Sequence, residues 1–247
     1  MLLLVLGCGP GGVSGVTDPL IVQAAFLGLV EPESKDIDLS DTDFDEGSAI
    51  TALLADAKSL ADVENAGVGG AEAQVRVGDT PVVELSPTED EGQYSATGSD
   101  GLVYSAGDEV LLTLVVDEVR STVWMELPEA SGVSVPETGV YGEDLPIDMS
   151  ETDFTQVLAT VINTKSGRVT WSNEPQGLKE WHEFTEVEGA ASFLIPAEAF
   201  TEPNAVFAVG IAGIEMASEE DLVEMNTALS GMQAGLLEFS PYLPLEE

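Results

Sequence analysis

The chain has 247 residues, with 46 Asp and Glu against 7 Lys and Arg, a formal net charge of −39 and 44% hydrophobic residues. Such a surface repels nucleic acid and anionic lipid headgroups, which excludes nucleic-acid binding and membrane attachment through a basic patch. The 25 Gly and 13 Pro favour short strands joined by turns. We therefore expect a mainly β protein with one or two antiparallel β-sandwich domains and a short helix near the C-terminus.

The first residues form an apolar run that ends at the only cysteine of the chain, Cys8, before a glycine-rich stretch. Val5-Leu6-Gly7-Cys8 resembles the lipobox of bacterial lipoproteins, in which the signal peptide is cut before a cysteine whose thiol carries a lipid. The resemblance implies an exported protein anchored to a membrane through Cys8, with residues 8–17 as a flexible tether. Residues 1–7 lack the basic start of a secretory signal, which predicts that the signal extends further upstream. The alternative is a soluble protein that begins with a buried strand and a buried free thiol.

Downstream of the tether, the nearly continuous apolar run Leu20–Val30 predicts a first buried strand. The acidic segment that follows is the candidate calcium site, because Ca²⁺ prefers about six to eight oxygen ligands from a pliable loop. Its five carboxylates are Asp36, Asp38, Asp41, Asp43 and Asp45. The segment is not an EF-hand, since Glu46 stands where glycine is required and Ala52 where a bidentate glutamate belongs. The alternative is a solvated acidic loop.

Residues 49–65 are compatible with a helix or with a strand at Ile50–Leu54, and both alternatives stay open. From residue 71 to 127, apolar runs alternate with turn-rich clusters at the spacing of antiparallel strands. The predicted strands are Ala73–Val77, Val82–Leu85, Gly101–Tyr104, Val110–Val116 and Thr122–Leu127. With Ala73-x-Val75, Gly92-x-Tyr94 and Gly107-Asp108 before its strands, this region resembles the immunoglobulin-like and transthyretin-like sandwiches of exported bacterial proteins. It is also similar to the first sandwich of uncharacterised outer-membrane lipoproteins that accompany nutrient receptors.

A stretch rich in Gly, Pro and Ser, Glu129–Pro146, separates a first sandwich of residues 18–130 from a second β-rich domain of residues 131–247. The strands expected in the second domain are Val157–Asn163, Gly167–Ser172, Ala191–Ile195 and Ala205–Ile214. Glu219–Gly231 predicts the C-terminal helix, because acidic residues crowd its first turn and a glycine can end it. Pro241 and Pro244 predict an extended tail.

The residue types give little support for catalysis. His182 is the only histidine, so a zinc site built from several imidazoles is excluded, and no serine-nucleophile motif is present. We therefore expect no enzyme, no catalytic residue and no cofactor apart from the candidate calcium. Paired carboxylates that hydrolyse a glycan are the alternative, since 46 acidic residues offer many pairs.

Aromatic side chains are the candidates for binding a sugar ring or a partner protein. The set comprises Trp171, Trp181, Tyr94, Tyr104 and Tyr141. The alternative is that Trp124 and Trp171 fill the sandwich core, as aromatic residues in strand patterns usually do. Trp181 and His182 have charged neighbours, so we expect them to be partly exposed and available for binding.

Together these observations predict an exported, membrane-anchored lipoprotein at the outer membrane or cell surface. We expect it to act as a binding or accessory module of the cell envelope, with an envelope protein or a glycan as partner. The alternatives are a calcium-stabilised adhesion protein and a carboxylate-dependent glycan hydrolase.

Overall fold

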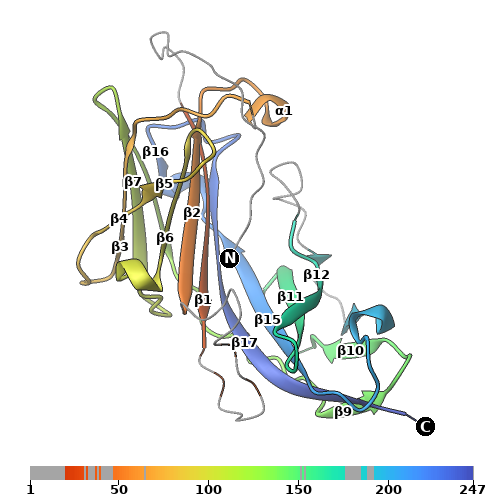
Figure 1. Ribbon diagram of the computed structural model, residues 1–247. Coiled ribbons are helices and arrows are strands. Elements are labelled where there is room, and N and C mark those ends of the chain that lie inside the picture. Colours follow the sequence, from red (N-terminus) through yellow and green to blue (C-terminus); the bar gives the residue numbers. More distant parts are fainter. Residues whose placement is uncertain are drawn as a thin grey trace.

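Figure 1 shows a computed structural model of the chain, in which β-strands make up most of the regular structure. It describes residues 20–30, 32, 37, 39, 47–63, 65–150, 152, 154–175, 185–187 and 192–246. Within these ranges the longest helix, α1, has four residues. The expected mainly β fold class is confirmed.

The first half of the chain carries strands of five to nine residues together with shorter ones. Its elements are β1 (Ile21–Leu29), β2 (Ser48–Ala55), α1 (Leu60–Val63), β3 (Glu72–Val77), β4 (Val83–Glu84), β5 (Ser86–Pro87), β6 (Gln93–Thr97), the 3-10 helix η1 (Gly98–Asp100), β7 (Glu109–Val116) and β8 (Val119–Glu126). The second half contains β9 (Thr138–Val140), β10 (Leu145–Asp148), β11 (Gln156–Asn163), β12 (Arg168–Ser172), β13 (Thr185–Glu186), β14 (Ser192–Ile195), η2 (Ala197–Ala199), β15 (Phe207–Met216), η3 (Glu219–Asp221), β16 (Leu222–Val223) and β17 (Gly231–Leu245).

The larger of the sheets has ten strands, eight of which lie in the order β12-β11-β15-β17-β1-β2-β6-β5. β1 is an interior strand that pairs with β2 in antiparallel and with β17 in parallel orientation. Buried residues occur on both of its faces, which explains why its sequence is a continuous apolar run rather than an alternation. The first and last long strands of the chain are therefore direct neighbours.

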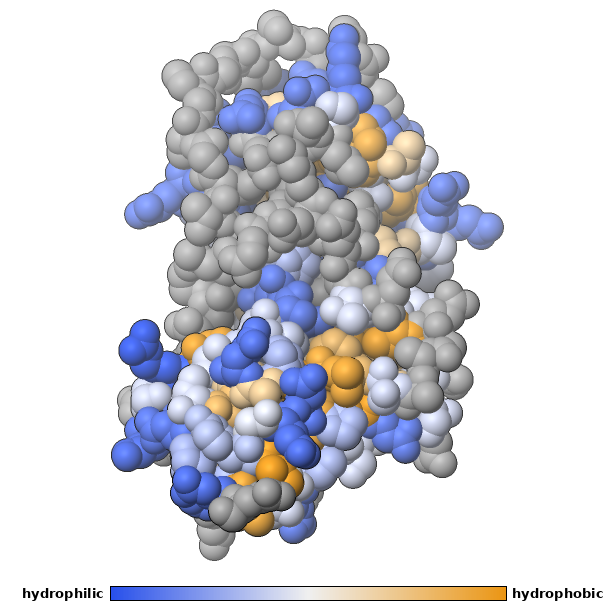
Figure 2. All heavy atoms as spheres, turned by 90° about the vertical axis from the view of Figure 1, so that its right-hand side faces the viewer, coloured by the Kyte–Doolittle hydropathy of each residue, from blue (hydrophilic) through white to orange (hydrophobic). Residues whose placement is uncertain are grey.

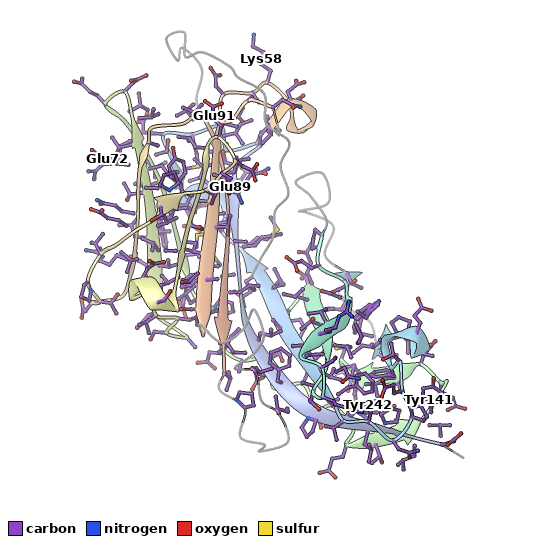
Figure 3. The ribbon with its side chains drawn as sticks, in the orientation of Figure 1. Lys58, Glu72, Glu89, Glu91, Tyr141 and Tyr242 are labelled. Carbon is purple, nitrogen blue, oxygen red and sulfur yellow. The ribbon has the colours of Figure 1, made fainter. Side chains whose placement is uncertain are left out.

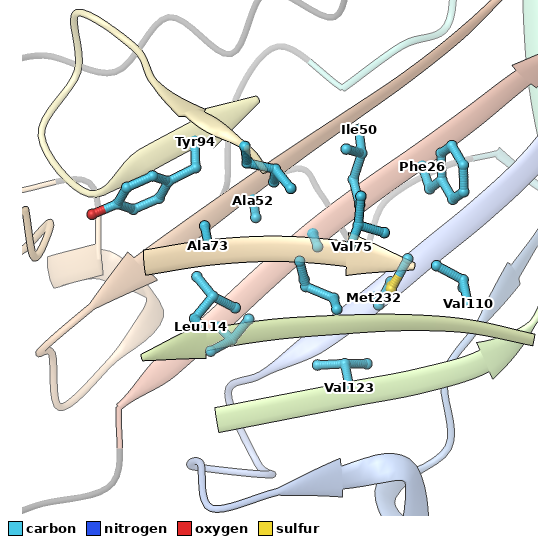
Figure 4. Close-up of a cluster of buried hydrophobic side chains, with 14 of the residues drawn as sticks. Phe26, Ile50, Ala52, Ala73, Val75, Tyr94, Val110, Leu114, Val123 and Met232 are labelled. Carbon is cyan, nitrogen blue, oxygen red and sulfur yellow. The ribbon is translucent and has the colours of Figure 1, made fainter. Parts of the chain in front are cut away.

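A second sheet of five strands, in the order β16-β8-β7-β3-β4, packs against the β1, β2 and β6 part of the larger sheet. Figure 4 shows the cluster between them, where Val75 and Leu114 of the smaller sheet meet Ile50 and Met232 of the larger one. Complete burial of an aliphatic side chain of this size contributes about 1.5–3 kcal/mol relative to exposure. This first core is therefore a main source of stability.

A second core lies where the two-stranded sheet β10-β14 packs near β11 and β15. Three aromatic rings meet there: the centroid of Phe200 is 5.4 Å from that of Phe207 and 4.6 Å from that of Tyr242. Such tilted and edge-on contacts add about 0.5–1.5 kcal/mol beyond area burial.

The 15-residue strand β17 joins the two cores (Figure 1). It contributes Met232 to the first core and Tyr242 to the second, and β15 pairs along most of its length. Along the other edge of β17, β1 pairs with residues up to Leu237, and β9 pairs with residues from Leu243 onwards. Pro241 falls between these two pairings, where its missing N–H interrupts neither ladder. The tail expected to be extended is thus a paired strand.

The helix expected at Glu219–Gly231 is wrong. Glu219–Asp221 form a single 3-10 turn with Ser218 as its N-cap, and Leu222–Val223 form β16. Leu222 pairs with Val123 of β8 and lies in the first core. The capping residues favour a single helical turn here. The chain then continues as a strand instead of a helix, because Leu222 is buried by pairing with β8.

Two other expectations also differ from the structure. The strand expected at Gly101–Tyr104 is a turn followed by irregular chain, and Gln93–Thr97 supplies the strand instead. The expected linker Glu129–Pro146 contains β9 and the start of β10. The ten-stranded sheet includes strands from both sides of residue 130.

Candidate functional site

Several of the site residues that the sequence singled out lie outside the described ranges, namely Cys8, the acidic residues Asp36, Asp38, Asp41, Asp43 and Asp45, and the pair Trp181 and His182. The other aromatic candidates, Trp171, Tyr94, Tyr104 and Tyr141, lie inside them. Within the described ranges, no group of three or more His, Cys, Asp or Glu side chains is arranged to hold a metal ion. The calcium site and the lipid anchor therefore stay predictions.

Two of the candidate aromatic residues have structural roles. Tyr94 is buried, and its hydroxyl donates to the carbonyl of Val68 and accepts from the N–H of Ala71. Burial raises the pKa of the Tyr94 hydroxyl. Trp171 is half-buried against the second core, with its ring centroid 6.4 Å from that of Phe193. Neither ring is presented as a flat exposed platform.

Trp124 is the aromatic residue that the structure places differently from expectation. It is 41% exposed on β8, on the face of the five-stranded sheet that points away from the first core. The neighbours Val123 and Met125 are buried in that core, because successive side chains of a strand point to opposite faces. The signal was present in the sequence: Thr122 and Glu126, two residues to either side of Trp124, are polar and share its face.

The register of β3, β7 and β8 sets which side chains surround Trp124. Directly paired residues share a face, and Trp124 lies opposite Leu111, which in turn lies opposite Arg76. The nine residues of what we call the Trp124 face form three rows, Trp124-Leu111-Arg76, Thr122-Thr113-Gln74 and Arg120-Val115-Glu72. With strands about 4.8 Å apart and about 3.4 Å per residue, the Cα positions span about 10 by 14 Å.

Charge distinguishes the Trp124 face from the rest of the molecule. Its nine residues include two arginines and one glutamate, whereas the whole chain has 46 acidic residues against 7 basic ones. Further glutamates, Glu84, Glu109 and Glu126, lie at its border on β4, β7 and β8. Figure 3 shows Glu72 of this face projecting on the outer side of the five-stranded sheet. With these glutamates included, the outer side holds four glutamates and two arginines, so it is less acidic than the chain as a whole but still net negative.

The side chains of the Trp124 face are suited to non-covalent binding. None of its nine residues is a histidine or a cysteine. The indole of Trp124 offers a flat apolar surface and an N–H donor, and Thr113, Thr122 and Gln74 offer hydroxyl and amide groups. Stacking combined with hydrogen bonds of this kind is how proteins commonly hold sugar rings and polar partners.

Among the described residues, the other strongly exposed apolar side chains lie on separate elements, and one of them, Val223 of β16, lies opposite Thr122 of the Trp124 face. Figure 2 views the side of the molecule away from the five-stranded sheet, where hydrophobic patches lie between hydrophilic residues in the lower half. In the second half of the chain, Val169 and Leu194 are the most exposed aliphatic residues, and they belong to separate elements, β12 and β14. Tyr141 is 39% exposed beside the short strand β9.

No protein-family model and no curated protein matches the chain. Within the described residues, each helix is too short or too polar to cross a membrane.

Proposed function

We propose that this chain is an exported lipoprotein of the bacterial cell envelope that binds an envelope glycan through the Trp124 face. In this proposal Cys8 carries the lipid anchor, at the outer membrane or cell surface, and the two packed sheets are a sandwich of the immunoglobulin-like or transthyretin-like class. The observation that carries the binding role is the exposed indole of Trp124 among uncharged polar and arginine side chains.

The composition of the face favours a sugar ring as the ligand. An exposed tryptophan gains most from a partner with a flat apolar surface, and the C–H groups of a pyranose provide one. Hydroxyl groups around the ring can pair with Thr113, Thr122 and Gln74, which lie one row away from Trp124. The face and its bordering glutamates are net acidic, which favours a neutral sugar over an anionic one.

Co-sedimentation with purified peptidoglycan tests this proposal. Removal of an aromatic anchor from a binding surface costs about 2 kcal/mol or more, which corresponds to roughly 30-fold weaker binding. We expect Trp124→Ala to lose this much affinity while its melting temperature stays near that of the wild type, because the side chain packs outside the core.

Tyr141→Ala is the matched control. Its ring is about as exposed as that of Trp124, and Figure 3 shows it at the other end of the molecule from Glu72 of the Trp124 face. Binding by Tyr141→Ala should equal that of the wild type. Wild-type binding by Trp124→Ala, or an equal loss in both variants, would contradict the proposal.

A further inference from the structure

Two of the three arginines in the chain lie on the Trp124 face. They are Arg76 on β3 and Arg120 on β8, and the third is Arg168 on β12. Both side chains on the face are exposed. In the part of the chain that the structure describes, no hydrogen bond or ion pair engages either guanidinium group. The face therefore presents two sets of charged donors that are open to a ligand, in a chain with 46 acidic residues.

Arg76 is placed to act together with Trp124. The two residues share a row of the face with Leu111 of β7 between them, so their Cα atoms lie about 10 Å apart. The stem of an arginine can lie along an apolar surface while its guanidinium group stays in solvent, and the half-buried Leu111 offers that surface beside Arg76. A sugar that stacks on Trp124 and covers Leu111 therefore meets the donors of Arg76 at one end.

The charges around the face restrict which acceptor Arg76 can bind. A carboxylate is the usual partner of an arginine, but Glu72 on the face and the glutamates at its border repel an anionic ligand. The acceptor must therefore come from a neutral group. The carbonyl oxygen of an acetamido group is a stronger acceptor than a hydroxyl oxygen, because amide resonance places partial negative charge on it.

We propose that the Trp124 face selects saccharides that carry N-acetyl groups, and that Arg76 donates to the carbonyl oxygen of an acetamido group. This inference rests on the proposed glycan binding and adds the chemical feature that the site recognises. Trp124 stacks on a sugar ring with or without the acetamido group, whereas Arg76 distinguishes the two kinds of sugar. Hydrogen bonds from a charged donor are about twice as strong as those between neutral groups, which makes such a contact selective.

The disaccharide of N-acetylglucosamine and cellobiose are matched ligands for the test. They differ only in the group on the second carbon of each ring, which is acetamido in the first and hydroxyl in the second. We expect calorimetric titration of the wild-type protein to give about tenfold tighter binding of the N-acetylated disaccharide, the effect of one charge-assisted hydrogen bond. Trp124→Ala should weaken the binding of both disaccharides alike.

Arg76→Gln and Arg120→Gln are matched variants, because they remove the same charge from the same face. Arg120 lies two rows away from Trp124, whereas Arg76 shares its row. We expect Arg76→Gln to bind the two disaccharides about equally, and Arg120→Gln to keep the preference of the wild type. Both side chains are exposed, so both variants should melt near the wild-type temperature.

Equal affinities of the wild-type protein for the two disaccharides would overturn this inference and leave the proposed glycan binding intact. An unchanged preference in Arg76→Gln would do the same, as would peptidoglycan binding without binding of the N-acetylated disaccharide. Tighter binding of a disaccharide that carries a carboxylate would show that the arginines select an anion instead. Absence of binding to both disaccharides and to peptidoglycan would overturn the proposed function together with this inference.

Discussion

The ring of Tyr104 lies against the backbone of Gly28, so closely that a Cβ at residue 28 would come within 2.2 Å of Tyr104 Cγ. The same ring is 5.1 Å from that of Phe26, and its hydroxyl donates to the carbonyl of Pro128 at 2.9 Å. Gly28 is therefore needed for its lack of a side chain, and Tyr104 covers that end of β1.

Gly28→Ala should destabilise the protein, because the new methyl group must displace a packed ring. Overpacking of this kind costs about 1–3 kcal/mol, measurable by urea unfolding. In a Tyr104→Ala background the same substitution should cost little, since the two positions are in contact and their effects couple. Gly69→Ala is the control, because its Cβ would make an ordinary contact, 3.5 Å from Glu91 Cγ. If Gly28→Ala lowered the free energy of unfolding equally in the wild-type and Tyr104→Ala proteins, the contact between Gly28 and Tyr104 would be contradicted.

Stability should fall in alkali because of Tyr104. Burial, with a smaller contribution from Glu215, raises the pKa of the Tyr104 hydroxyl well above its ordinary value of 10.0. The folded state therefore holds this proton more tightly than the unfolded state. The contribution of the protonated Tyr104 hydroxyl to the free energy of unfolding is complete below pH 10. It is lost as the pH rises from there through the pKa of Tyr104 in the folded state.

Urea unfolding on both sides of pH 10, with tyrosinate absorbance recorded in parallel, measures this effect. Tyr104→Phe should have a shallower loss of stability with rising pH than the wild type. Identical slopes for the two proteins would show that Tyr104 ionises alike in the folded and unfolded states.

The lipid anchor predicted at Cys8 is tested by mass spectrometry of the protein isolated from bacterial membranes. We expect an N-terminal cysteine that carries a diacylglyceryl group, and a Cys8→Ser variant that leaves the membrane fraction. A single acyl chain binds membranes only marginally, so a diacyl anchor is needed for stable attachment. An unmodified Met1 with a free thiol at Cys8 would refute the assignment.

Calcium binding by the acidic segment stays a prediction that calorimetry can settle. Titration of the purified protein with millimolar Ca²⁺ should release or absorb heat, and Asp41→Asn together with Asp43→Asn should abolish the signal. Carboxylates supply most of the ligand charge in calcium loops, so their loss weakens affinity strongly. Absence of heat from the wild-type protein would remove calcium from consideration.

The strands that alternate or stay apolar over many residues were predictable from the sequence. The predicted strands at residues 20–30, 110–116 and 157–163 coincide, to within one residue at each end, with β1, β7 and β11, because burial on one or both faces leaves a clear pattern. β17 was not recognised, because Gly231, Gly235 and two prolines interrupt its pattern. Its strand conformation depends on partners far away in sequence, which no local propensity encodes.

The candidate sites were less predictable than the fold. The alternative that Trp124 fills the core, which rested on its place in a strand pattern, is wrong, and its polar neighbours at alternate positions indicate the outer face.

The position of β17 at the end of the chain also affects when the protein can fold. The N–H of Val22 donates to Ser230 Oγ, 208 residues further along the chain. Both cores also contain side chains from β17, which is synthesised late. Contacts this distant in sequence form slowly, since a long loop must close first. The ten-stranded sheet can therefore be completed only when synthesis is nearly finished, because both β1 and β15 pair with β17.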